Sequence, residues 1–200
     1  METQESRILS KIRRKGRGAV YCNKDFLGLG SRAAVDQALN RLARRGELRR
    51  IARGLYYLPK SSRRLGELSP DMEKVANAAA RKTGATIAPT GAAAANALGL
   101  STQVPAKAIF LTDRRLRPIN IGKSVVEFRQ VAPRVLRVQS EASTLLLQAL
   151  RYLGRNAIDD DMIKTIRARL NATQRQSFAE EARYSMDWIV EVARKIATEA

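Results

Sequence analysis

Residues 31–59, SRAAVDQALNRLARRGELRRIARGLYYLP, decide the fold of this chain. Val35, Ala38, Leu39 and Leu42 recur at the spacing of one helix face, and Ser31 precedes them as a candidate cap. Gly46 stands where a helix commonly ends in a left-handed residue. Two short strands, 47–52 and 55–58, are expected to follow, joined at Arg53-Gly54. The stretch therefore predicts a helix followed by a β-hairpin.

The residues before this stretch predict the rest of a winged helix-turn-helix. A first helix over residues 3–15 has Thr3 as its candidate cap and an apolar side at Ile8, Leu9 and Ile12. Residues 19–21 are a short strand that can pair with the hairpin. A second short helix, 24–29, is expected to turn Phe26 and Leu27 inward. The order helix, strand, helix, helix and hairpin is that of a winged helix.

The remaining chain predicts a different kind of domain. Residues 59–70 have no periodic apolar pattern and are expected to form a linker. Helices and short strands are expected to alternate up to residue 131, and helices to dominate from residue 140, with a last helix over 173–197 that buries Met186. The predicted class is α+β, with a winged helix-turn-helix domain at 1–62 and a mixed α/β domain with a helical end at 67–200.

Positive charge is concentrated at the start of the chain. The formal net charge is +18, and residues 1–66 hold 17 Lys and Arg against 5 Asp and Glu. Residues 67–200 hold 20 against 14. A basic module of this kind favours a polyanionic partner, which here is expected to be double-stranded DNA.

The composition argues against an enzyme. Without a histidine, Ser-His-Asp and Cys-His nucleophilic systems are excluded, and the single cysteine, Cys22, excludes a thiolate zinc site. Asp159, Asp160 and Asp161 fit a helix N-terminus better than a metal site. We expect no catalytic residue, no metal and no cofactor. The absence of a long apolar run or a signal-peptide pattern predicts a cytoplasmic protein that does not contact membranes.

Polar residues on the predicted 32–44 helix are candidates for reading DNA bases. Arg can bond guanine, and Asn or Gln can bond adenine, through two hydrogen bonds each in the major groove. A solvated polar face is the alternative interpretation. The base-reading candidates are Arg32, Asp36, Gln37, Asn40 and Arg41.

Further cations follow along the helix end and the hairpin. They suit phosphate contacts, which position a protein on DNA without reading its sequence. Charge that keeps an exposed edge soluble is the alternative. The phosphate candidates are Arg44, Arg45, Arg49, Arg50, Arg53 and Lys60, with Arg63 and Arg64 just after them.

Residues 31–59, with Gly54-Leu55-Tyr56 after the hairpin turn, resemble the N-terminal winged helix of the AbiEi-type antitoxins of type IV toxin–antitoxin systems and the related DUF6088-like family. The stretches TIAPTGAAAANALGLSTQVPAKAIFLTD at 86–113 and SVVEFRQV at 124–131 extend the resemblance to about residue 135. The resemblance implies a repressor that binds the promoter of its own operon through the winged helix. It also implies that the second domain counteracts a cognate nucleotidyltransferase-like toxin, a partner in phage defence by abortive infection.

Two other functions remain open at this point. The chain can be a stand-alone winged-helix regulator whose second domain senses a ligand or dimerises. It can also be a nuclease or nucleotidyltransferase with a basic substrate-binding domain, although no set of catalytic carboxylates supports this. The sequence defines neither the DNA site nor the oligomeric state.

Overall fold

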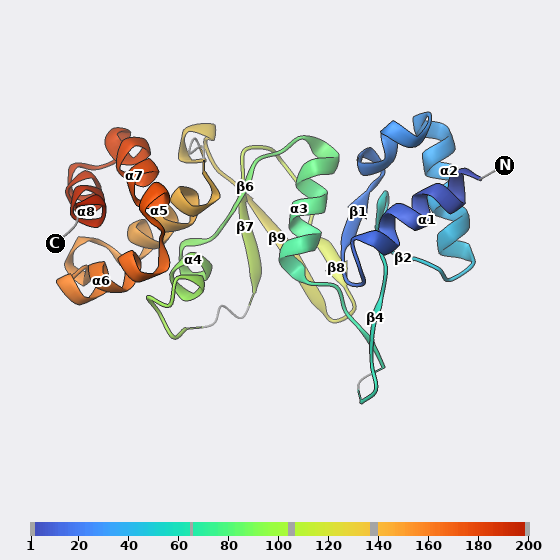
Figure 1. Ribbon diagram of the computed structural model, residues 1–200, viewed down its shortest axis with the longest axis horizontal. Helices are drawn as coiled ribbons and strands as arrows, with labels where there is room; N and C mark the ends of the chain where they lie inside the picture. The colour runs from blue at the N-terminus through green and yellow to red at the C-terminus, as the bar shows by residue number, and fades with distance from the viewer. Residues whose placement is uncertain (1–2, 65, 104–106, 137–139, 199–200) are drawn as a thin grey trace. The chain divides into compact units, whose positions relative to one another are not determined.

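The computed structural model describes residues 3–64, 66–103, 107–136 and 140–198, and Figure 1 traces them in chain order. The chain divides into two compact units, residues 1–87 with 114–130 and residues 88–113 with 131–200. Helices and small sheets build the first unit, and helices dominate the second. The predicted α+β class is confirmed. The predicted domain limits, 1–62 and 67–200, stay a prediction.

The first unit begins with the elements of a winged helix. They are α1 (Gln4–Arg14), β1 (Val20–Cys22), the 3-10 helix η1 (Asn23–Leu29), α2 (Arg32–Arg44), β2 (Arg49–Ala52) and β3 (Leu55–Tyr57). The strands form an antiparallel sheet in the order β1-β3-β2. The short strand before η1 therefore pairs with the hairpin, as expected, and the winged-helix order is confirmed.

Local chemistry explains where α2 begins and ends. The Ser31 hydroxyl accepts a hydrogen bond from the Ala34 amide at 3.3 Å, which satisfies one of the free N–H groups of the first turn. Gly46 has a φ of +77°, a conformation that costs glycine little. Both predicted ends of the helix are confirmed.

One apolar core joins α1, η1, α2 and the sheet. Burying a Leu, Ile or Phe side chain contributes roughly 1.5–3 kcal/mol, so this core is the main stabilising feature of the winged helix. Its buried members are Ile8, Leu9, Ile12, Tyr21, Phe26, Val35, Ala38, Leu39, Leu42, Leu48 and Tyr56. The expectation that Leu27 packs inward is wrong, because its side chain is 44% exposed while Phe26 fills the core.

The expected linker is instead a β-hairpin. β4 (Lys60–Ser62) pairs with β5 (Gly66–Leu68) in an antiparallel register that sets Ser61 opposite Glu67. Figure 1 shows β4 running out along a narrow projection, which we call the arm. The prediction failed because these strands carry no apolar alternation and depend on contacts with β2 and β3 instead.

A third α-helix and a third hairpin complete the first unit. α3 (Met72–Thr83) packs against β1, with its first turn capped by Asp71, whose carboxylate accepts from the Lys74 amide at 3.1 Å. β8 (Ile119–Ile121) pairs with β9 (Ser124–Gln130) and lies against β2. This hairpin turns at Gly122, which has a φ of +58°.

The second unit is mostly helical. Its elements are β6 (Ile87–Pro89), α4 (Gly91–Ala97), β7 (Ala108–Thr112), η2 (Pro133–Val135), α5 (Glu141–Leu153), η3 (Arg155–Ala157), α6 (Asp160–Arg169), α7 (Ala172–Glu181), η4 (Ala182–Tyr184) and α8 (Asp187–Ala197). α5 contacts α4 and α7, and its fully buried Leu146 and Leu150 anchor the core. The Asp159 carboxylate caps α6 by accepting from the Met162 amide at 2.7 Å.

The prediction of one helix over 173–197 is wrong. Asn171 caps α7, and the chain breaks at η4 before α8 begins. Ile189 of α8 is buried in the same core as Phe178 of α7, so the chain reverses to place both there. Met186 lies at the break and is 51% exposed rather than buried.

Across the described ranges of the chain, no helix combines the length and the apolar character that crossing a bilayer requires.

Candidate nucleic-acid interface

Four exposed residues of α2 form a stripe along the helix. Ala33, Gln37, Asn40 and Arg44 are spaced so that they lie on one side of the helix, and all four are exposed. The opposite side is the one that enters the core. This α2 stripe contains two of the five base-reading candidates, and it adds Arg44, which the sequence placed among the phosphate contacts.

Asn40, at the centre of the α2 stripe, is held in place by a hydrogen bond from the sheet. The hydroxyl of the buried Tyr56 donates to Oδ1 of Asn40 at 3.1 Å. An amide oxygen accepts two hydrogen bonds, so Oδ1 and the N–H groups of Asn40 retain the capacity to pair with adenine. Within the described residues, the Arg44 side chain has no ion-pair partner. The stripe thus places the restrained amide of Asn40 beside the guanidinium of Arg44.

Two other base-reading candidates form an ion pair at the edge of the stripe. Arg32 lies 3.8 Å from Asp36, one helical turn away. Asp36 also accepts a hydrogen bond at 2.9 Å from Nδ2 of Asn23, which is only 3% exposed. These contacts give Asp36 a structural task, since it ties α2 to η1.

The other edge of the stripe is tied to α1. Glu5 accepts from Arg41 at 3.1 Å and from Arg45 at 2.6 Å, and Arg41 also donates to Gln37 at 3.4 Å. The hydrogen bond from Arg45 is the main reason that the pKa of Glu5 is lowered. Arg45 contacts Glu47 as well, at 3.0 Å. The candidates Arg41 and Arg45 are therefore partly neutralised within the protein.

The turn of the β2–β3 hairpin is packed against α3. Nζ of Lys82 donates to the carbonyl oxygen of Arg53. Gly54 has a φ of +72°, and a Cβ at this position would lie 3.3 Å from Cε of Lys82. With only Arg53 and Gly54 between its strands, this hairpin is short and its tip is covered on one side.

Four cations gather around that turn. The pKa of Lys82 is lowered first by burial and then by the positive charge of Arg53, with smaller effects of Arg32 and Arg50. Arg50 and Arg53 are exposed and, among the residues that the structure describes, have no carboxylate partner. We call Arg32, Arg50, Arg53 and Lys82 the Lys82 cluster. A phosphate group is the ligand that such a concentration of N–H donors and positive charge favours.

Lys82 was not among the sequence candidates. It lies in the last turn of a helix, where cations are common because the helix dipole favours them. Its position next to Arg53 comes from the packing of α3, which no local pattern reveals.

Arg81, the neighbour of Lys82, shows how α3 is attached to the winged helix. Its guanidinium contacts both carboxylate oxygens of Asp25, at 3.0 and 3.1 Å, and donates to the carbonyl of Val20 at 3.1 Å. Burial has the largest single effect on the pKa of Asp25 and raises it, but the hydrogen bonds from Arg81 and from the Cys22 amide, with the charge of Arg81, together outweigh burial. The pKa of Asp25 is therefore lowered. The Asp25–Arg81 pair places Lys82 beside the β2–β3 turn.

Two phosphate candidates belong to the base of the arm. Arg49 donates to both oxygens of Glu67, at 3.0 and 2.9 Å, and Tyr57 donates to the same carboxylate at 3.1 Å. The side chain of Lys60 lies against Gly18. Arg49 is thus occupied in holding β5, whereas Arg63 and Arg64 at the end of the arm are exposed.

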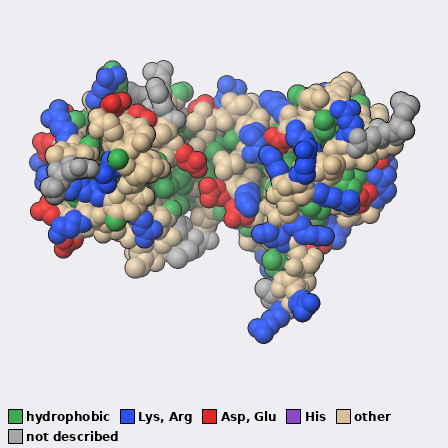
Figure 2. Space-filling model, in the orientation of Figure 1, with side chains coloured by type: hydrophobic (Ala, Val, Ile, Leu, Met, Phe, Trp, Pro, Cys, Tyr) green, Lys and Arg blue, Asp and Glu red, His purple; other side chains and the backbone are tan. Residues whose placement is uncertain are grey.

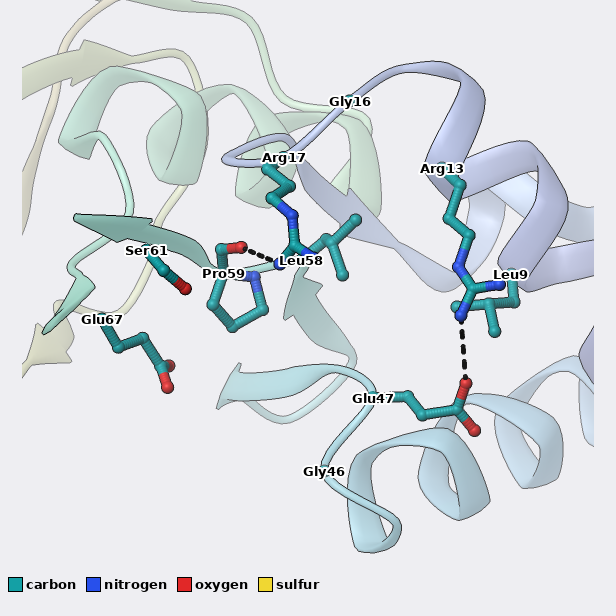
Figure 3. A pocket seen from close by; sticks show the side chains of 10 residues that line it. All are labelled: Leu9, Arg13, Gly16, Arg17, Gly46, Glu47, Leu58, Pro59, Ser61 and Glu67. Carbon is teal, nitrogen blue, oxygen red and sulfur yellow. Dashed lines mark hydrogen bonds and ion pairs between the residues drawn. The ribbon is translucent and has the colours of Figure 1, made fainter. Parts of the chain in front are cut away.

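A cavity of about 460 Å³ lies between the end of α1, the α2–β2 loop and the base of the arm (Figure 3). Arg13 lies 3.8 Å from Glu47, and Arg17 donates to the carbonyl of Pro59 at 3.1 Å. Both arginines are therefore engaged with other residues of the cavity wall. The cavity is better explained as a gap between braced segments than as a ligand site.

The fold and this surface define a winged-helix protein with a cationic face. The chain belongs to DUF6088, a family of unknown function, which matches residues 7–178 and so spans both units. No curated protein shows a significant match to the chain. Membership in this family assigns no activity to the chain, and it does not establish that the chain is an AbiEi-type antitoxin.

Proposed function

We propose that this protein is a transcription regulator that docks α2 in the major groove of double-stranded DNA. One observation carries the proposal: the α2 stripe exposes Asn40 and Arg44 next to the Lys82 cluster. An α-helix fits the major groove, where Asn pairs with adenine and Arg with guanine. Cations beside the helix meet the phosphates that border the groove.

The resemblance to the AbiEi-type antitoxins makes the proposal more specific. On that basis the protein represses its own operon and counteracts a cognate nucleotidyltransferase-like toxin through its C-terminal part. The alternative is a stand-alone winged-helix regulator whose second unit senses a ligand or dimerises. A toxin gene next to the gene for this chain favours the antitoxin, and its absence favours the stand-alone regulator.

A mobility-shift titration with the DNA upstream of the gene tests DNA binding. Asn40→Ala and Arg44→Ala are each expected to reduce discrimination between the site and a scrambled duplex by about 1–3 kcal/mol. Arg155→Ala is a suitable control, because Arg155 is an exposed cation of the second unit. If the unaltered chain fails to bind duplex DNA at low salt, the proposal is wrong.

Co-expression tests the antitoxin role separately. The full chain is expected to restore growth of cells that express a neighbouring nucleotidyltransferase-like gene. Within the described residues, Asn40→Ala removes the proposed base contact and the hydrogen bond from Tyr56, both in the first unit, so this variant should restore growth as well. Failure of the unaltered chain to restore growth would leave a regulator without an antitoxin role.

A further inference from the structure

The arm ends in two arginines. Arg63 and Arg64 follow β4 at the turn, and both are exposed. The Arg64 amide donates to the Ser62 hydroxyl at 3.3 Å, which shapes the turn. Within the described part of the chain, neither guanidinium has a carboxylate partner. Figure 2 shows cationic side chains at the end of this projection, with no acidic ones beside them.

The base of the arm is braced on both strands. On β5, Glu67 is held by Arg49 and Tyr57. Before β4, Arg17 donates to the Pro59 carbonyl at 3.1 Å, and the Gly18 amide donates to the Leu58 carbonyl at 2.7 Å. A braced two-stranded ribbon loses little conformational freedom on binding. Its tip is therefore suited to contact a ligand that lies away from the body of the first unit.

The two hairpins of the winged helix therefore differ in what they can reach. The β2–β3 turn is short and covered by Lys82, whereas each strand of the arm has three residues. At about 3.3 Å per residue, a ribbon of this length measures roughly 10 Å. That length is comparable with the depth of the DNA minor groove, about 7.5 Å.

The arm also starts at a definite place relative to α2. Glu67 holds Arg49, the first residue of β2, which comes soon after the last residue of α2. The arm therefore begins beside the C-terminal end of this helix. On a duplex, the groove next to the major groove across one phosphate backbone is the minor groove.

We propose that the arm inserts Arg63 and Arg64 into the DNA minor groove next to the major groove that α2 occupies. The inference rests on the proposed DNA-binding function. Narrow A·T-rich minor grooves have an enhanced negative potential that attracts arginine, so the arm reads groove width rather than base edges. The bound site is then expected to extend past the bases under α2 into an A·T-rich flank.

The test compares two duplexes that share the bases under α2 and differ in the flank, which is A·T-rich in one and G·C-rich in the other. The full chain is expected to bind the A·T-flanked duplex about tenfold more tightly. Arg63→Ala/Arg64→Ala should abolish this preference. The control Arg155→Ala/Arg183→Ala removes the same charge from exposed positions of the second unit and should keep it.

Competition with netropsin, which occupies A·T minor grooves, gives a second measurement. Netropsin should lower the affinity of the unaltered chain to that of the arm variant and should leave the arm variant unchanged. A chain that binds both duplexes equally, or an arm variant that keeps the flank preference, overturns the arm proposal. Failure of the unaltered chain to bind any duplex overturns the proposed DNA-binding function instead.

Discussion

The hydroxyl of Tyr56 donates to Oδ1 of Asn40 at 3.1 Å, which joins the sheet to the centre of the α2 stripe. Tyr56 is only 2% exposed, while Asn40 is exposed on the helix. A buried residue with a defined position thus limits the rotation of a side chain that faces solvent. This restraint reduces the entropy lost when the amide binds a base.

Tyr56→Phe is expected to relax base discrimination without abolishing DNA binding. The variant keeps the ring in the core and removes only the hydrogen bond, so the free energy of unfolding should fall by about 1 kcal/mol. Binding to a randomised duplex library should show weaker selection at the position that Asn40→Ala also affects. If Tyr56→Phe keeps full base selectivity while Asn40→Ala loses it, the hydrogen bond from Tyr56 does not position the Asn40 side chain for base recognition.

The Lys82 cluster predicts a change in salt dependence. Lys82→Gln should weaken binding to all duplexes alike and reduce the slope of log K against log salt by about 0.9, the value for one phosphate contact. Removing this half-buried charge also relieves its repulsion with Arg53. Titrations at several salt concentrations measure the slope.

Lys164→Gln is the matched control for Lys82→Gln. Lys164 is an exposed lysine of the second unit and is paired with Asp161 at 2.9 Å. Its replacement should leave the slope unchanged. If the slope of log K against log salt is unchanged in Lys82→Gln as well, Lys82 does not contact a phosphate.

The winged helix could be predicted from the sequence because its signals are local. Ser31 and Gly46 mark the ends of α2, and Val35 to Leu42 define its buried side within a single stretch. The arm could not be predicted, since its strands have no alternating pattern and Glu67 finds Arg49 eighteen positions earlier in the chain. Lys82 was missed for the same reason, because its neighbour Arg53 lies 29 positions away.

The break between α7 and α8 shows a different limit of pattern reading. The spacing of Phe178, Ala182, Ile189 and Ala193 is that of one continuous helix, although they lie on α7, η4 and α8. The apolar period continues in phase through residues 182–186, so periodicity alone predicts a single helix. The start signal at Asp187 is one acidic residue in a first turn, which is weak on its own.

The Asp25–Arg81 pair predicts a pH-dependent contribution to stability. The pKa of Asp25 is lowered in the folded protein, so the pair stabilises above the unfolded pKa of about 3.9 and this contribution is lost as the pH falls through the folded pKa. Asp25→Asn should lower the free energy of unfolding by about 1 kcal/mol at pH 7, a modest value because Arg81 is half exposed.

Urea denaturation of both proteins at pH 7 and near pH 3 measures the effect of Asp25→Asn. The difference between the two proteins should narrow at the lower pH. A difference that stays constant would mean that the loss comes from packing and not from the charge of Asp25.

The close approach of Gly91 in α4 to α5 is expected to be important for the stability of the second unit. A Cβ at Gly91 would lie 2.4 Å from Cβ of Tyr152 and 2.8 Å from the carbonyl oxygen of Gln148, so one helix must move. Gly91→Ala should therefore lower the free energy of unfolding by about 1–3 kcal/mol, the cost typical of overpacking. Gly28→Ala is the control, because a Cβ at Gly28 would meet no atom within 4 Å. Urea denaturation followed by circular dichroism compares the two variants, and equal stability would contradict the close approach of α4 and α5.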